Sequence, residues 1–107
     1  RYALYESKYT ALLANKPLAP HTETVTIAGK YCESGDLIAK DISFPKADVG
    51  DIVAVLATGA YNYSMAMNYN RIGKPPVVLV RDGKARLIVK REDYDDLIRN
   101  DIIPEDL

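Results

Sequence analysis

The chain has 107 residues and a net charge of −1, from 14 basic and 15 acidic side chains, and it contains one cysteine and one histidine. This length suits one domain with its own core and is too short for a two-domain enzyme that includes a cofactor barrel. The interspersed charges argue against nucleic acid, the short apolar runs argue against a membrane helix, and one Cys with one His argues against a zinc site.

The first residues, "RYALYESKY", contain no initiator methionine and no signal peptide, so we expect the chain to be part of a longer protein. They show no clean hydrophobic period, and we predict an extended segment. A single cysteine cannot form an internal disulfide, which is typical of a reducing compartment, and we expect a cytoplasmic location.

Residues 22–30, "TETVTIAGK", alternate polar and apolar side chains, which predicts a half-buried strand that ends at Gly29. Residues 37–44 are rich in apolar side chains and suit a short strand or an irregular turn. Residues 52–57, "IVAVLA", form an unbroken apolar run, which favours a strand buried on both faces.

Asp82 and Gly83 separate two β-rich runs in "PVVLVRDGKARLIV", and this pattern predicts a hairpin with a tight turn. Before it, Ser64 is a candidate cap for a helical turn over residues 65–69. After it, residues 92–99 have the apolar spacing of a short amphipathic helix. The chain is therefore predicted to be mainly β: one domain, residues 1–107, forming a small barrel with short peripheral helices.

Cys32 and Glu33 lie side by side in "CESGD", where Ser34 to Asp36 read as a sharp turn. One interpretation is a structural thiol, because cysteine is among the most buried residue types. The other is a proton donor, since an unperturbed thiol, with a pKa of about 8.5, is protonated at neutral pH. Both interpretations stay open on the residues alone.

Tyr61 belongs to "GAYNYSMAMNYN", in which tyrosines and asparagines follow the apolar run directly. The tyrosines can be core residues with satisfied hydroxyl groups. Alternatively, the small residues Gly59 and Ala60 let a ligand approach the backbone while Tyr61 offers it a ring face and a hydroxyl. The spacing does not decide between these two interpretations.

Taken together, "RYALY", "CESGD", "GAYNYSMAMNYN" and "PVVLVRDGKARLIVKRED" resemble the C-terminal domain of diaminopimelate decarboxylases, in the same order and over essentially the whole chain. These are pyridoxal-phosphate enzymes of the alanine racemase-like group that make lysine. The resemblance implies a β-barrel domain that works with an N-terminal (β/α)₈ barrel, in which the Schiff-base lysine lies. It also implies a homodimer in which the Cys-Glu loop reaches the cofactor of the neighbouring subunit.

By the same resemblance, Cys32 is the proton donor and Glu33 contacts the distal ammonium of diaminopimelate. Tyr61 is implied to contact both the substrate and pyridoxal phosphate, and Arg1 and Tyr5 to bind the distal carboxylate. Arginine suits a carboxylate because it donates two parallel hydrogen bonds. Tyr2 and Lys30 depart from the prolines that are usual in the family, which affects loop shape more than chemistry.

Two alternatives to this function remain. A related decarboxylase of the same fold acts on ornithine, arginine or carboxynorspermidine, although the ornithine type usually has Asp after the Cys, where this chain has Glu33. The other alternative is a non-catalytic β-barrel interaction domain with a structural Cys32.

Overall fold

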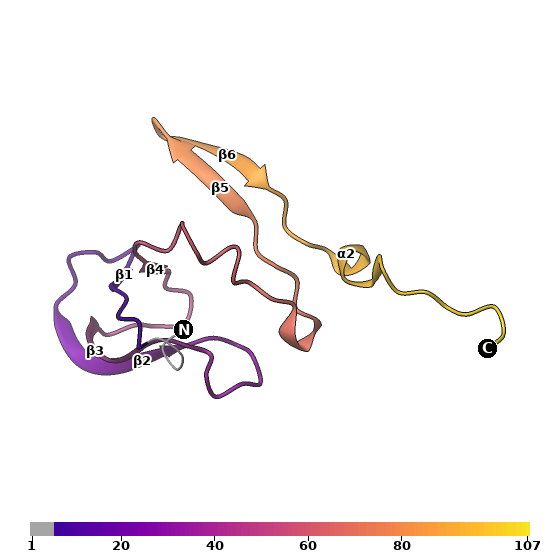
Figure 1. The fold of residues 1–107 in the computed structure, drawn as a ribbon. Coiled ribbons are helices and arrows are strands. Elements are labelled where there is room, and N and C mark those ends of the chain that lie inside the picture. Colours follow the sequence, from indigo (N-terminus) through magenta and orange to yellow (C-terminus); the bar gives the residue numbers. More distant parts are fainter. Residues whose placement is uncertain (1–5) are drawn as a thin grey trace. The chain divides into compact units, whose positions relative to one another are not determined.

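The computed structural model describes residues 6–107, whose strands pair into three separate two-stranded antiparallel sheets (Figure 1). The chain divides into two compact units, with the boundary between Ala60 and Tyr61. In the part of the chain that the structure describes, no helix is long and apolar enough to cross a membrane.

The first unit is built on a long antiparallel pair, β2 (His21–Ala28) with β3 (Leu37–Pro45). Val25 and Ile27 of β2 are partly buried and alternate with exposed neighbours, so the predicted period-two strand is confirmed. The pairing contains register shifts, and Asp41 of β3 has a φ of 51°, which marks an irregularity in that strand. The β2–β3 connection is the segment that carries Cys32.

A second pair joins β1 (Ala11–Leu13) to β4 (Val53–Val55) and forms the other side of the core of this unit. Leu13 and Phe44 are 0% and 2% exposed and are the largest fully buried side chains. Ala11 completes the buried cluster, and four partly buried residues pack against it: Val25, Ile27, Ile42 and Val55. Burial of this apolar surface is the main force that holds β1 and β4 against the β2–β3 pair.

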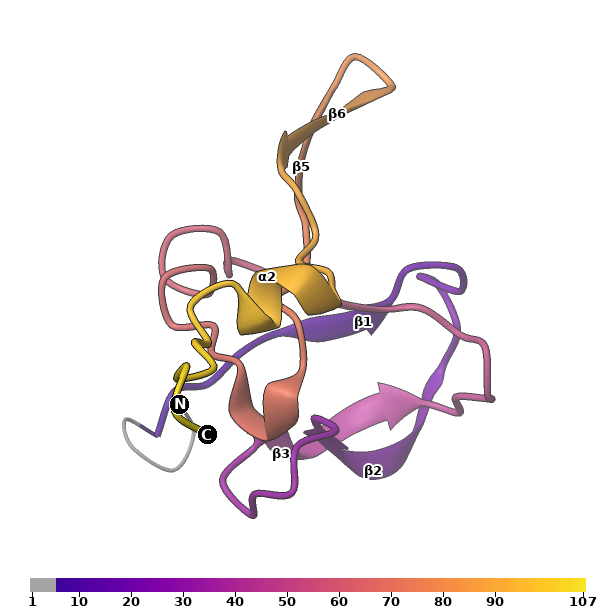
Figure 2. The ribbon, with the colours of Figure 1, turned by 90° about the vertical axis from the view of Figure 1, so that its right-hand side faces the viewer.

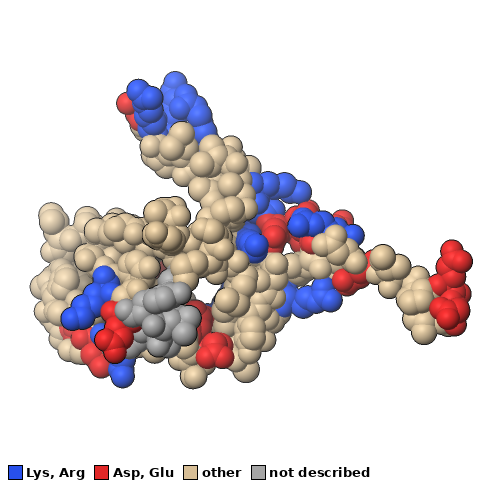
Figure 3. All heavy atoms as spheres, in the orientation of Figure 1, with Lys and Arg blue, Asp and Glu red and all other residues tan. Residues whose placement is uncertain are grey.

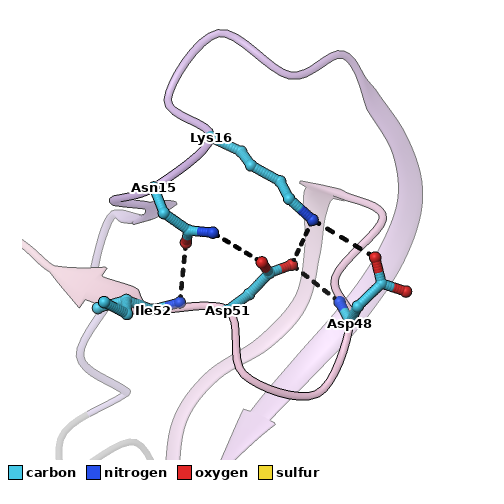
Figure 4. Close-up of polar contacts among 5 residues, drawn as sticks. All are labelled: Asn15, Lys16, Asp48, Asp51 and Ile52. Atoms are coloured by element: carbon cyan, nitrogen blue, oxygen red, sulfur yellow. Dashed lines mark hydrogen bonds and ion pairs between the residues drawn. The ribbon is translucent and has the colours of Figure 1, made fainter.

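A polar network links the end of β1 to the turn before β4 (Figure 4). The Asp51 carboxylate accepts hydrogen bonds from Asp48 N at 2.9 Å, Lys16 Nζ at 2.8 Å and Asn15 Nδ2 at 2.7 Å. The backbone amide of Asp48, followed by the side chains of Lys16 and Asn15, lowers the pKa of Asp51 to about 2. The same hydrogen bond shifts the pKa of Lys16 in the opposite direction, to a raised value, because it stabilises the charged ammonium group. Asn15 Oδ1 also accepts from Ile52 N at 2.9 Å.

The second unit contains the hairpin β5 (Val77–Arg81) and β6 (Lys84–Val89), the short 3₁₀ helix η1 (Tyr69–Arg71) and the helix α2 (Tyr94–Ile98). Figure 2 shows β5 and β6 running side by side to a tight turn. Asp82 and Gly83 have φ values of 51° and 69°, so both central turn residues are left-handed and the predicted tight turn is confirmed.

Charged side chains are unevenly distributed over this unit. Figure 3 shows basic side chains gathered at the turn end of the hairpin, where Arg81, Lys84 and Arg86 are exposed.

Helix α2 begins with a capping box, in which Asp93 accepts from Asp96 N at 3.0 Å and Asp96 accepts from Asp93 N at 2.9 Å.

The mainly β class is confirmed, but the strands of residues 6–107 do not close into the expected barrel. Closure needs a continuous ladder around the ring, and β1 and β4 have only three residues each. The strand predicted over residues 52–57 is shorter and less buried than expected, since Ile52 is 61% and Val53 42% exposed.

Of the two short helices that the sequence predicts, one is corrected and the other is confirmed. Ser64 does not cap a helix over residues 65–69, because its hydroxyl donates back to Tyr61 O at 3.3 Å, and the short helix begins at Tyr69. The helix expected near the C-terminal end is confirmed as α2; on its apolar face Leu97 is half-buried, whereas Tyr94 is 85% and Ile98 54% exposed.

Candidate functional site

Cys32 and Glu33 lie in the loop that connects β2 to β3, residues 29–36, which we call the Cys-Glu loop. The loop is closed at its base by a hydrogen bond from Gly29 N to Asp36 O of 2.8 Å. Inside it, Asp36 N donates to Glu33 O at 3.1 Å, and at its end Leu37 N, the first residue of β3, donates to Gly35 O at 2.8 Å. These bonds give backbone groups at the base and in the turn of the loop hydrogen-bond partners within the same segment.

The two side chains with candidate chemistry are both exposed. This excludes a Cys32 buried in the core of the chain, and it leaves the thiol accessible to a substrate or partner. The Glu33 side chain folds back so that Oε1 accepts from Gly35 N at 2.8 Å. A carboxylate has about four acceptor positions, so this bond orients Glu33 and still permits it to accept from an ammonium group.

Asp36 has a larger part in this loop than its sequence position indicates. Its Oδ2 atom accepts a hydrogen bond from Tyr31 N at 3.0 Å, across the loop from its own backbone contacts. The sequence assigns Asp36 to the turn, which the bond from Asp36 N to Glu33 O confirms. No spacing rule for turns reveals a carboxylate that reaches back five residues, so this bridge was not predicted.

Tyr61 begins the second unit and is 73% exposed. Its carbonyl accepts from Met65 N at 3.0 Å, which forms a single helical turn, and this turn leaves the ring at the surface. The interpretation of Tyr61 as a core residue of this chain is therefore wrong. The contact of Tyr61 with the substrate and pyridoxal phosphate stays a prediction, and Arg1 and Tyr5 lie outside the described residues.

Within residues 6–107, no group of three or more His, Cys, Asp or Glu side chains is arranged to hold a metal ion. Cys32 and Glu33 place one thiol and one carboxylate on adjacent residues of the Cys-Glu loop. A thiol can donate a proton, and a carboxylate can accept hydrogen bonds from a cation.

Comparison with known proteins places the chain in a family. Residues 1–59 match the family model described as "Pyridoxal-dependent decarboxylase, C-terminal sheet domain". A diaminopimelate decarboxylase from Synechocystis is 56% identical over 103 residues, and one from Bacillus methanolicus is 62% identical over 92 residues. These alignments cover 96% and 86% of this chain but only 22% and 21% of the two relatives.

Solved structures extend the likeness to the backbone. Two crystal structures of diaminopimelate decarboxylase from M. jannaschii, the second in complex with L-lysine, align with TM-scores of 0.89 and 0.88 at 41% identity. Each alignment covers 100% of this chain and 24% of the solved chain. The chain thus belongs to the pyridoxal-dependent decarboxylases, in the family of their C-terminal sheet domain.

Proposed function

We propose that this chain is the C-terminal domain of a diaminopimelate decarboxylase, which converts meso-2,6-diaminopimelate into L-lysine and CO₂. In this proposal it acts with an N-terminal (β/α)₈ domain that binds pyridoxal phosphate, in a homodimer located in the cytoplasm. The supporting observation is that a chain collinear with proteins of that name presents Cys32 and Glu33 together in an exposed loop.

Pyridoxal phosphate, when bound, accepts the electron pair that loss of CO₂ leaves at Cα of the substrate. The residues of this chain fit such a group as contacts and not as its covalent attachment. Tyr61 has an exposed ring and follows the small residues Gly59 and Ala60, so its ring face and hydroxyl are accessible to a planar aromatic ligand. We assign Tyr61 to contacts with both the cofactor and the substrate.

Cys32 is the proposed general acid. After the bond between Cα and the carboxylate carbon breaks, Sγ of Cys32 gives its proton to Cα, which forms the new C–H bond of lysine. The resulting thiolate then takes a proton from solvent, which its exposed position allows. One proton is consumed for each CO₂ released, so the thiol returns to its starting state.

Glu33, Arg1 and Tyr5 are proposed to recognise the distal end of the substrate. Diaminopimelate carries an ammonium and a carboxylate at that end, so recognition needs groups of both signs. Glu33 supplies the anion for the ammonium, and Arg1 supplies two parallel donors for the carboxylate, with Tyr5 beside it. A decarboxylase that forms a diamine has no distal carboxylate to bind and no need of that arginine.

The deciding experiment is Cys32→Ala in the intact protein that contains this chain. Loss of a general acid should lower kcat for diaminopimelate about 100-fold or more while the cofactor stays bound. The measurement is lysine formation per bound pyridoxal phosphate, with Ser34→Ala as the control variant in the same loop. Turnover that stays close to wild type would instead support a non-catalytic interaction domain with a structural thiol.

A further inference from the structure

The Asp36 carboxylate occupies the space directly over Gly29. A Cβ atom built on Gly29 would overlap with Cγ, Oδ1 and Oδ2 of Asp36, so the close approach is possible only because residue 29 lacks a side chain. Gly29 is not in the left-handed region, so its requirement comes from this contact and not from its φ angle.

Asp36 also makes hydrogen bonds to three separate points of the Cys-Glu loop. Its backbone oxygen accepts from Gly29 N at 2.8 Å, its Oδ2 atom accepts from Tyr31 N at 3.0 Å, and its backbone nitrogen donates to Glu33 O at 3.1 Å. Tyr31 and Glu33 are the two chain neighbours of Cys32. The side chain of Asp36 therefore holds one flank of the cysteine, and its backbone holds the other.

From this geometry we infer that Asp36, packed against Gly29, is a positioning residue. It sets where the loop presents the Cys32 thiol and the Glu33 carboxylate. The inference rests on the proposed function, in which that thiol delivers a proton. Proton transfer depends steeply on the distance between donor and acceptor, and a displacement of about 1 Å can lower a rate by about 100-fold. Without the carboxylate, the Tyr31 amide loses this acceptor, and the segment before Cys32 loses its contact with the Asp36 side chain.

The first test compares Asp36→Ala with Asp36→Asn in the intact enzyme. Asp36→Ala should lower kcat per bound cofactor by about 10- to 100-fold, because the Tyr31 amide loses a charged acceptor. Asp36→Asn should restore most of the activity, because its amide oxygen can still accept from Tyr31 N. Asp106→Ala, which removes an exposed carboxylate near the C-terminal end, is the control and should behave as wild type.

A residue that only stabilised the fold would change the amount of folded enzyme, and kcat per bound cofactor would stay constant. The inference is overturned if Asp36→Ala retains wild-type kcat, or if Asp36→Asn is as impaired as Asp36→Ala. If Asp36→Ala does not fold, Asp36→Asn and Gly29→Ala still test the contact.

The second test is a double-mutant cycle that does not depend on turnover. The rate at which iodoacetamide alkylates Cys32, followed by mass spectrometry of its peptide, reports the surroundings of the thiol. Gly29→Ala should change this rate several-fold in the wild-type background, because the new methyl group displaces the Asp36 carboxylate. In the Asp36→Ala background the three overlapping atoms are gone, so the same substitution should have little further effect.

Additive effects of Gly29→Ala and Asp36→Ala would show that the carboxylate and the glycine act separately, and would overturn the inference. Its failure is distinguishable from failure of the proposed function. If Cys32→Ala leaves lysine formation unchanged, the proposed function fails, while the alkylation cycle still reports on the loop. If Cys32→Ala abolishes turnover and both Asp36 variants match wild type, only the positioning inference fails.

Discussion

Glu33 combines a local contact with a proposed role toward substrate. The bond from Gly35 N to Oε1 fixes the direction of its side chain, and the exposed position makes the carboxylate accessible from solvent. The distance that the carboxylate reaches from the backbone is set by two methylene groups. Substrate choice among decarboxylases of this fold is thus expected to depend on that length.

Glu33→Asp in the intact enzyme withdraws the carboxylate by one methylene, or about 1.5 Å, and should weaken its charge-assisted hydrogen bond to the distal ammonium. We expect kcat/KM for meso-diaminopimelate to fall about 10-fold or more relative to kcat/KM for L-ornithine. Both constants would be measured for wild type, Glu33→Asp and the strand control Glu23→Asp. A wild-type enzyme that prefers ornithine, or a ratio that Glu33→Asp leaves unchanged, would contradict the assignment.

At the level of elements, the first unit depends on a contact between the segments that follow β1 and precede β4. β1 and β4 are three residues long, so their ladder supplies few hydrogen bonds. The Asp51 carboxylate adds bonds from Asn15 and Lys16, and its side chain is 9% exposed. Partial removal from solvent makes this ion pair less sensitive to salt than an open surface pair.

The pKa of Asp51 predicts how this contact depends on pH. Its value in the folded chain is about 2, below the ordinary value of 3.8, because the ionised carboxylate is the better hydrogen-bond acceptor. A lowered pKa means that the stabilisation is complete above pH 3.8 and is lost as the pH falls toward 2. Lys16, whose pKa is raised above 10.5, contributes stabilisation that is complete below that value and is lost as the pH rises through its folded pKa.

We therefore expect Asp51→Asn to lower the urea midpoint of unfolding at pH 7, and the difference from wild type to shrink as the pH falls from about 4 to about 2. Asp106→Asn serves as a control for the loss of one exposed charge. A difference between Asp51→Asn and wild type that is the same at pH 7 and pH 2.5 would contradict this account of the network.

For the whole molecule, the chain matches only 21–24% of the length of its curated relatives. The proposed enzyme then needs a cofactor-binding domain in addition to the residues described above. In the proposed homodimer, the Cys-Glu loop of one subunit serves the cofactor of the other. This arrangement has a consequence that can be measured without a structure of the assembly.

Two inactive variants of the intact enzyme should restore activity when their subunits are mixed. One is Cys32→Ala, and the other has its cofactor-binding lysine in the N-terminal domain replaced. Random reassociation makes half of the dimers mixed, and each mixed dimer has one intact site out of two, so about one quarter of wild-type activity is expected. The measurement is lysine formation after denaturation and refolding of the mixture. If each active site uses the cysteine of its own subunit, the mixture stays inactive.

Patterns carried by adjacent residues were predictable from the sequence. The alternation in β2, the Asp82–Gly83 turn and the adjacency of Cys32 with Glu33 are all local, because each depends on residues within a few positions of one another. Contacts between distant residues were not predictable, such as the bonds of Asp51 to partners 35 and 36 residues away. Within the Cys-Glu loop, the close contact of the Asp36 carboxylate with Gly29 was also not predictable from the sequence, although the two residues are only seven positions apart.

By itself, then, the sequence determined the alternating strand β2, the β5–β6 hairpin with its turn, and the pair of residues with candidate chemistry, since backbone preferences and side-chain order act over short distances. The tertiary structure alone decided the exposure of Cys32, the limited burial of β4 and the bridge that Asp36 makes across its loop. The physical reason is that burial and close contact depend on which residues pack against one another when the chain folds. The same local sequence pattern is compatible with more than one such packing arrangement.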